Sequence, residues 1–338
     1  MPINDTINML SLVTRAGKPS RSKLSPQENS MIIVTGATGK LGEAIVEGLL
    51  KNLSPDQIGV SVRDPQKAQE LAERGIRVRQ GDFSDPASLR HAFEGASQVL
   101  VVSVNALGPG AVEQHGNAIA AAKAAGAGRV LYTSHMAASP DSAFSPARDH
   151  AATEGLLQSS GMLFTSLRNG FYAESALWQL GSVKKTHKLA LPEDGPVSWT
   201  SRSDLAEAAV VALTHPELLN GITPPLTNPK TLDFAAIAQV ASEIIGRQIT
   251  RETIADNAFR QLLLASGLPE PMADGVVGLF VASRQGEFAA TDPTLGAPAW
   301  ATGNADAGLL RAASCAASLV EASDKLGRQA DSGSRRQV

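Results

Sequence analysis

Residues 31–42 read MIIVTGATGKLG, an apolar run that passes directly into three glycines at the spacing G-x-x-G-x-x-G. A short apolar run bounded by glycine predicts a buried parallel strand. In the turn that follows, Gly36 would allow the tight bend, Gly39 the close approach of a pyrophosphate, and Gly42 the packing of a helix on the strand. The stretch predicts a dinucleotide-binding turn at a helix N-terminus. A purely structural strand-helix turn that binds nothing is the open alternative.

Strand and helix patterns continue to alternate along the chain after this turn. We expect strands at 58–62, 77–80, 98–102, 129–133 and 163–167, and helices at 41–51, 66–73, 86–93, 112–125 and 146–159. Repeated strand-helix-strand units imply a parallel sheet covered by helices on both faces. The predicted fold is therefore α/β, a doubly wound parallel Rossmann sheet with a smaller C-terminal α/β lobe.

The periodicity loosens after Arg168, where we expect a strand at 195–200 and helices at 203–213, 234–245 and 257–287, the first of them capped by Ser203. Four parts follow from this reading: a flexible N-terminal extension (1–30), an NAD(P)-binding Rossmann domain (31–170), a smaller substrate lobe (171–310) and a flexible tail (311–338). The first 30 residues are alternatively a targeting segment, or lie upstream of the true start at Met31.

Composition excludes several classes of protein. Of 338 residues 43% are hydrophobic and 19% are charged, and the formal net charge is −3, so neither nucleic acid nor an anionic membrane is an expected partner. The single cysteine, Cys315, permits no intramolecular disulfide and no cysteine-ligated metal, and we expect no metal site. No apolar run reaches the length of about 18 residues that a membrane-spanning helix needs. We expect a cytoplasmic protein.

The end of the second predicted strand bears on the choice of dinucleotide. An acidic residue there would bind the ribose 2′-hydroxyl of NAD, whereas an arginine accommodates the 2′-phosphate of NADP. The sequence has Arg63 followed by Asp64, with Lys67 one turn further on. Arg63 can form a charge-assisted contact to phosphate, so we expect NADPH. NADH stays possible if Asp64 takes the ribose and Arg63 is solvated.

Other strand ends supply further candidates for cofactor binding. Asp82 can accept from the adenine amino group and Phe83 can pack on the ring, with a turn aspartate and a core phenylalanine as the equal alternative. Ser103 and Val104 follow the fourth strand, where the fold places a ribose. Ser134 is interpreted as a hydrogen-bond partner of the ribose or the substrate.

The chemistry is limited by what the chain lacks. Tyr132 and Tyr172 are the only tyrosines, and neither has a lysine four residues later, so ordinary alcohol-ketone chemistry is disfavoured. Hydride transfer to a quinone or a cationic dye needs no strong protein acid. His150 could donate a proton or hydrogen bond to a quinone oxygen. Alternatively His150 and Glu154, at helical i,i+4 spacing, only pair with each other and shape the pocket.

Five stretches together resemble the NmrA-like atypical short-chain dehydrogenases, in particular their quinone oxidoreductase-2-type and triphenylmethane reductase-like members. They are VTGATGKLG, GDFSD, LYTS followed by His135, His150-x-x-x-Glu154 and LRNGFYAES, and the likeness covers about residues 31–295. The resemblance implies a pyrophosphate site at Gly36, Thr38, Gly39, Lys40 and Leu41, a 2′-phosphate contact at Arg63, and a nicotinamide site at Asn169, Gly170, Phe171 and Tyr172. The N-terminal extension and the tail after residue 298 depart from the family pattern.

Two kinds of function fit these residues. The first is an NADPH-dependent reductase that transfers hydride to a quinone or a similar electron-poor small molecule, with His150 and Tyr172 as the predicted catalytic residues; hydride transfer to an imine or enone is a variant of it. The second is an NAD(P)-sensing regulatory protein without turnover. An open cleft near Tyr172 and Trp178 would favour the enzyme, and a filled cleft with an exposed apolar patch would favour the sensor. A homodimer stays open.

Overall fold

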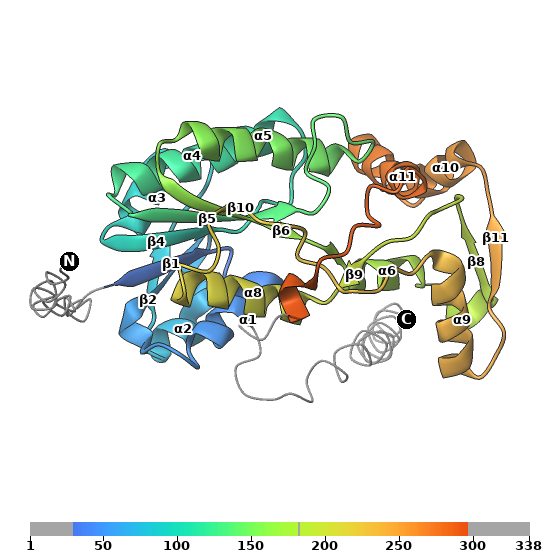
Figure 1. The fold of residues 1–338 in the computed structure, drawn as a ribbon, viewed down its shortest axis with the longest axis horizontal. Helices are drawn as coiled ribbons and strands as arrows, with labels where there is room; N and C mark the ends of the chain where they lie inside the picture. Colours follow the sequence, from blue (N-terminus) through green and yellow to red (C-terminus); the bar gives the residue numbers. More distant parts are fainter. Residues whose placement is uncertain (1–29, 182, 297–338) are drawn as a thin grey trace, which may run out of the picture. The chain divides into compact units, whose positions relative to one another are not determined.

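The computed structural model describes residues 30–181 and 183–296. Its main feature is a parallel seven-stranded sheet with the strand order β10-β6-β5-β4-β1-β2-β3 (Figure 1). The strands are β1 (Met31–Thr35), β2 (Ile58–Val62), β3 (Arg77–Gln80), β4 (Ala96–Val101), β5 (Arg129–His135), β6 (Leu163–Asn169) and β10 (Gly221–Ile222). The order reverses between β1 and β4, which is the switch point at which doubly wound sheets bind ligands.

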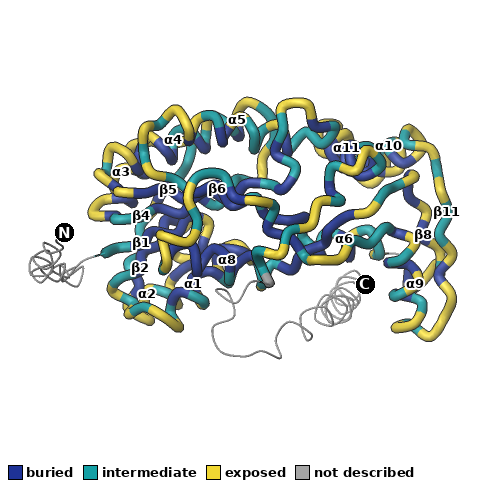
Figure 2. The backbone as a smooth tube through the Cα atoms, in the orientation of Figure 1, coloured by how far each residue is buried: buried dark blue, intermediate teal, exposed yellow. Residues whose placement is uncertain are grey.

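Helices cover both faces of this sheet (Figure 1). On one face lie α1 (Lys40–Leu49), α2 (Gln69–Glu73) and α8 (Arg202–Thr214), and on the other α3 (Pro86–Phe93), α4 (Pro109–Ala124) and α5 (Ser145–Ser159). Side chains alternate along β1, so that Ile32 and Val34 join the core beneath α1 and α8 while Ile33 joins the core beneath α3 and α4. The strands are accordingly the most continuously buried part of this unit (Figure 2).

The segment after β6 builds a second hydrophobic core. It contains the short parallel pairs β7 (Phe171–Tyr172) with β9 (Trp199–Thr200), and β8 (Lys188–Leu191) with β11 (Thr250–Thr253). Its helices are α6 (Ala173–Gln179), α7 (Val183–Thr186), α9 (Phe234–Ile245), α10 (Asp256–Ala265) and α11 (Glu270–Arg284). Several aromatic side chains pack against one another in this core, among them Phe234, Phe259 and Phe280.

The predicted α/β Rossmann fold is confirmed, and apart from the elements named next the predicted boundaries agree with the observed ones to within three residues. Strand β10 is absent from the prediction because two residues carry no pattern. The helix predicted at 257–287 is two helices, since the chain turns at Gly267 with a φ of 88°. The strand predicted at 195–200 is reduced to β9.

A further correction concerns the start of α8. Ser201, not Ser203, is the N-cap, because the Ser201 hydroxyl accepts a hydrogen bond from the backbone N–H of Asp204 at 3.1 Å. Helix α3 is capped by Asp85, whose side chain accepts from the N–H groups of Ala87 and Ser88.

The division of the chain at residue 170 stays a prediction. Two elements from the range 171–310 belong to the Rossmann unit: α8 packs against α1, and β10 pairs with β6. The other elements of this range form the second core. The predicted extension up to residue 29 and the predicted tail at 311–338 lie outside the described residues. No helix in the described ranges is long and apolar enough to cross a membrane.

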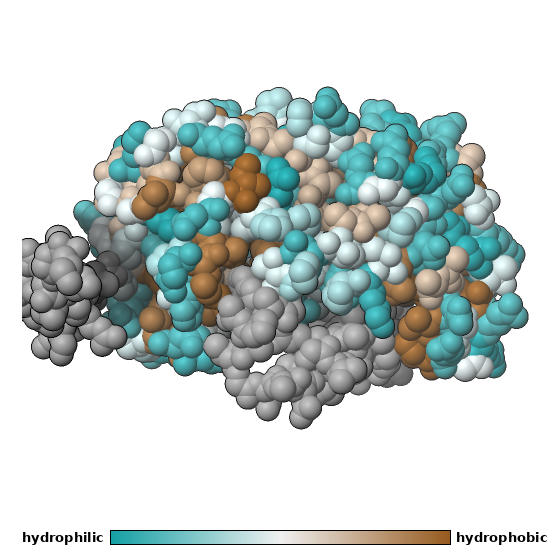
Figure 3. All heavy atoms as spheres, in the orientation of Figure 1, coloured by the Kyte–Doolittle hydropathy of each residue, from teal (hydrophilic) through white to brown (hydrophobic). Residues whose placement is uncertain are grey.

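Apolar side chains on the surface of this unit are scattered among polar ones on the face drawn in Figure 3. Leu163, Trp178 and Leu262 are the most exposed large apolar residues among those described. Single exposed apolar residues are normal for folded proteins, but Trp178 is of interest because it borders the cavity described below.

Candidate active site

The turn between β1 and α1 has the geometry that phosphate binding requires. Gly36 has a φ of 62°, and its carbonyl accepts from the N–H of Gly39 at 2.9 Å. A Cβ on Gly42 would lie 2.3 Å from the Gly36 carbonyl oxygen, so only glycine permits this approach. No side chain caps α1, which leaves N–H groups of its first turn available to an anion. Thr38 and Lys40 are exposed beside it.

Leu41 differs from the rest of the predicted pyrophosphate site. Its side chain is 6% exposed and belongs to the core beneath the sheet. Only the backbone of Leu41 can therefore face a phosphate, and the side chain anchors α1.

The end of β2 presents Arg63 rather than Asp64. The Asp64 carboxylate accepts from the backbone N–H of Gln66 at 3.1 Å and lies 4.0 Å from the Lys67 ammonium group. Arg63 is exposed, and its guanidinium forms no ion pair within residues 30–296 as far as they are described. The acid is thus engaged in the local turn while the arginine is available to a 2′-phosphate.

Asp82 and Phe83 are also held by their own surroundings. The Asp82 carboxylate accepts from the N–H of Ser84 at 2.8 Å, and the Phe83 carbonyl accepts from the Asn117 side chain at 3.0 Å. These contacts are those of the alternative interpretation, a turn aspartate beside the core, and an adenine contact at these residues stays a prediction.

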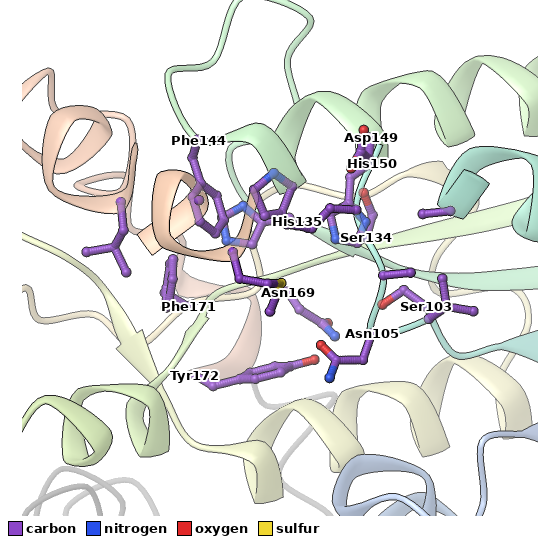
Figure 4. Close-up of a pocket in the computed structure, with 18 of the residues that line it drawn as sticks. Ser103, Asn105, Ser134, His135, Phe144, Asp149, His150, Asn169, Phe171 and Tyr172 are labelled. Atoms are coloured by element: carbon purple, nitrogen blue, oxygen red, sulfur yellow. The ribbon is translucent and has the colours of Figure 1, made fainter. Parts of the chain in front are cut away.

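A cavity of about 340 Å³ opens at the carboxyl edge of the sheet (Figure 4). The ends of β4, β5 and β6, the start of α5, and helices α6 and α11 contribute to it. Predicted site residues that line it are Ser103, Val104, Ser134, His150, Asn169, Gly170, Phe171 and Tyr172. Residues that the sequence did not indicate as its lining include Leu107, Asp149, Met272, Val276 and Leu279. Tyr172 and Trp178 both line this cavity, which is the feature expected of an enzyme rather than a sensor.

One wall of the cavity is aromatic. The ring centroids of Phe171 lie 5.4 Å from His135, 5.5 Å from Phe144 and 5.2 Å from Phe288. In Figure 4 the rings of Phe144 and Phe171 stand on the side of the cavity opposite Ser103. Edge-to-face packing of this kind builds a rigid apolar surface against which a flat ring can stack.

A histidine cluster forms the adjoining wall. The Tyr132 hydroxyl lies 2.7 Å from His150 Nδ1, and the His150 ring stacks on His135 at 6.0 Å between centroids. Burial lowers the pKa of His115 and of His135 to about 4, and it lowers the pKa of His150 well below its ordinary value. All three imidazoles are therefore neutral near neutral pH.

Glu154 does not pair with His150. Its carboxylate accepts from the Ser134 and Ser166 hydroxyls at 2.8 and 2.9 Å and from the Arg168 guanidinium at 2.7 and 3.0 Å. The alternative of a His150–Glu154 pair is wrong, because Glu154 lies beneath the sheet edge in a buried ion pair with Arg168. The Ser134 hydroxyl proton is engaged there as well, which leaves only its lone pairs for a ribose or substrate.

The ends of β6 and β7 supply a second kind of polar group. Asn169 is 2% exposed, and neither polar atom of its side chain has a hydrogen bond of good geometry within the described residues, although the amide lies close enough to Tyr172 to act on the pKa of its phenol. Buried amides are almost always hydrogen-bonded, so this one fits a bound ligand.

A Cβ on Gly170 would lie 2.3 Å from the Thr200 hydroxyl, so Gly170 permits the approach of β9. Burial raises the pKa of Tyr172, whose ring stacks under the Arg202 guanidinium at 4.9 Å.

Some site residues escaped the sequence analysis. His115 lies in the middle of α4 and Asp149 on α5, and neither belongs to a motif. The Asp149 carboxylate accepts from the N–H of Gly108 at 2.7 Å and so holds the loop after β4. The one signal in the sequence for His115 was a histidine within an alanine-rich predicted helix. The described residues contain no group of three or more potential metal ligands.

The fold and the turn define a dinucleotide-binding Rossmann protein with a small-molecule cavity beside the cofactor edge. The chain belongs to the NmrA-like family, whose sequence profile matches residues 28–302. This confirms the resemblance seen in the sequence motifs.

Relatives with known names are similar to most of this chain. It is 35% identical over 259 residues to quinone oxidoreductase 2 of Escherichia coli (strain K12), covering 76% of this chain and 89% of the relative. It is 32% identical over 251 residues to the NAD(P)H azoreductase of Xenophilus azovorans, covering 74% and 86%.

Solved structures are similar over the same range. The NADPH-dependent quinone oxidoreductase of Escherichia coli complexed with NADPH has a TM-score of 0.75 and 34% identity, over 79% of this chain and 93% of that one. The triphenylmethane reductase of a Citrobacter species complexed with NADP(H) has a TM-score of 0.73 and 31% identity, over 78% and 93%.

Proposed function

We propose that this protein is an NADPH-dependent reductase that transfers hydride to a quinone or a similar electron-poor small molecule. The observation that carries the proposal is the open cavity beside the glycine-rich turn, with an aromatic wall and neutral imidazoles. The names of the relatives, a quinone oxidoreductase and an azoreductase, support the same reaction class.

The residues at the sheet edge fit the cofactor. The uncapped start of α1 and the close approach of Gly42 to Gly36 suit a pyrophosphate, and the buried amide of Asn169 suits the nicotinamide end. Arg63 would bind the 2′-phosphate. When bound, NADPH supplies the hydride. The contribution of this chain is to hold the ring against the cavity and to exclude water.

The acceptor would lie between the aromatic wall and the histidines. Phe171 and Phe144 would stack on a flat ring, and His150 would donate a hydrogen bond to the oxygen that gains charge. Tyr172 would close the cavity on the side of the nicotinamide. A quinone takes up the hydride and one proton from solvent to become a hydroquinone, so no residue with the strength of a Tyr-Lys acid is required.

Two further proposals concern the compartment of the protein and its oligomeric state. The low cysteine content favours the cytoplasm, where thiols stay reduced. A homodimer is the second proposal, and light scattering of the purified full chain tests it.

The proposed function predicts an NADPH preference that depends on Arg63. Arg63→Ala should raise the KM for NADPH by about tenfold, the cost of one charge-assisted phosphate contact, and leave the KM for NADH little changed. The measurement is the loss of nicotinamide absorbance with a panel of quinones and a triphenylmethane dye. Arg90→Ala, which removes an exposed charge from α3, is the matched control.

Tight NADP binding without turnover on any acceptor would reject the reductase. Equal use of NADH and NADPH, unaltered by Arg63→Ala, would reject the 2′-phosphate contact alone.

A further inference from the structure

A chain of hydrogen bonds runs from the loop after β4 toward His150. The N–H of Val104 donates to His115 Nε2 at 3.0 Å, so this nitrogen carries a lone pair. A neutral imidazole has one N–H and one lone pair, and the proton of His115 is therefore on Nδ1, 3.0 Å from the Thr153 hydroxyl oxygen. Thr153 itself donates to the Asp149 carbonyl at 2.9 Å, which leaves its oxygen free to accept from His115.

These directions determine where Tyr132 donates. Its hydroxyl lies 3.4 Å from His115 Nδ1 and 2.7 Å from His150 Nδ1. Because His115 Nδ1 already carries a proton, it offers no lone pair. The Thr153 hydroxyl is a further neighbour of the phenol, but its oxygen already accepts from His115, so the phenol donates to His150 at 2.7 Å. Tyr132 is fully buried, and burial raises its pKa, so it keeps this proton. A neutral His150 that accepts at Nδ1 has its own proton on Nε2.

His135 has the same tautomer for a different reason. The N–H of Ala137 donates to His135 Nδ1 at 3.2 Å, which places the proton on Nε2. That Nε2 atom is buried and lacks a protein partner. The His135 and His150 rings stack at an interplanar angle of 24°, and both residues line the cavity (Figure 4).

We propose that Tyr132 is a positioning residue that holds His150 in its Nε2–H tautomer, so that the cavity offers the acceptor a neutral N–H donor. This inference rests on the proposed function and narrows its substrate class. Neutral donors stabilise an oxygen that becomes negative on hydride transfer, as in a quinone. They give little to a cationic dye, in which the hydride forms a C–H bond and cancels the charge.

The tautomer can be read directly. In protein labelled with ¹⁵N-histidine, NMR correlations through two bonds distinguish a protonated from an unprotonated ring nitrogen, and His150→Gln assigns the signals of His150. We expect His150 Nδ1 to be unprotonated and Nε2 to be protonated in the full chain. In Tyr132→Phe the proton should redistribute between the two nitrogens.

Turnover gives an independent readout. Tyr132→Phe should lower the ratio of quinone kcat to dye kcat by about tenfold, a modest part of what a positioned donor contributes, with little change in the KM for the quinone. Ser283→Ala removes a buried hydroxyl of α11 that does not line the cavity, and it should leave the ratio unchanged.

The two readouts separate the inference from the function on which it rests. A His150 proton on Nδ1 in the wild-type chain, or a tautomer that Tyr132→Phe leaves unaltered, would overturn the role of Tyr132. The NMR measurement needs no turnover, so an inactive protein with the expected tautomer would reject the proposed reaction while supporting the positioning role. A quinone-to-dye ratio that stays constant in Tyr132→Phe would contradict the narrowed substrate class.

Discussion

Glu154 shows that helical i,i+4 spacing does not by itself decide which side chain a carboxylate binds. It lies four residues after His150, yet its carboxylate, 4% exposed, is bound by Arg168 and two serine hydroxyls. A buried ion pair adds little net stability compared with apolar packing, but removal of one partner leaves a buried charge. The pair therefore matters most when it is broken.

Glu154→Gln should lower the free energy of unfolding by about 3 kcal/mol, because the Arg168 charge would lose its counterion. Urea unfolding measures this. Glu47→Gln breaks an ion pair with Arg74 whose side chains are 47% and 45% exposed, and should cost less than about 1 kcal/mol. Equal losses in the two variants would contradict the structural role of Glu154.

The buried histidines predict a pH dependence of stability. Burial lowers the pKa of His115 and His135 to about 4, from an ordinary value of 6.5. Between these values the unfolded chain binds protons that the folded protein does not, so stability is full above pH 6.5 and is lost as the pH falls toward 4. The urea concentration at the midpoint of unfolding should therefore fall as the pH is lowered from about 7.5 to about 5.

His135→Phe should weaken this pH dependence, whereas His91→Gln, at a side chain that is 67% exposed, should not. A midpoint that does not change over this pH range would show that folding does not lower the pKa of these histidines.

Among the elements, the N-terminal caps of the helices contribute to the stability of the fold. Helix α8 begins directly after β9, the strand that pairs with the cavity-lining strand β7. The helix packs on α1 and β6. Its cap is Ser201, which is 4% exposed. The sequence pattern favoured Ser203 because Asp204 follows it, but the helix starts one residue earlier.

Ser201→Ala should lower the free energy of unfolding by about 1 kcal/mol, the usual cost of a lost N-cap. Ser203→Ala should cost less, since Ser203 contacts only the Ser201 hydroxyl, at 2.7 Å. Thermal or urea unfolding of the two variants tests the assignment, and a larger loss in Ser203→Ala would reverse it.

At the scale of the whole described unit, the cavity exists because α11 from the second core packs against α5 and the segment before it. Gly278 lies at this contact. A Cβ there would lie 2.8 Å from the Ala143 carbonyl oxygen, which is backbone and can move only with its segment.

Gly278→Ala should displace α11, raise the KM for the acceptor several-fold and lower stability by about 1 kcal/mol, the lower end of the cost of overpacking. Gly155→Ala on α5 meets no atom within 4 Å, and should raise stability by about 0.5–1 kcal/mol through helix propensity. Steady-state kinetics and urea unfolding distinguish them. An unchanged acceptor KM in Gly278→Ala would show that α11 does not shape the acceptor site.

The α/β Rossmann fold class and the glycine turn could be predicted from the sequence, because each depends on local periodicity or on a motif of a few residues. The sequence also limited the chemistry, since neither Tyr132 nor Tyr172 is followed by the lysine of the usual pair. These properties are encoded within one strand-helix unit and need no distant contact.

The tertiary structure alone decided which polar groups meet. Tyr132 on β5, His115 on α4 and His150 on α5 come together only when both helices pack on the same face of the sheet. The same packing places the Glu154 carboxylate against Arg168 and not against His150. Hydrogen bonds across elements depend on side-chain direction and burial, and neither is contained in spacing along the chain.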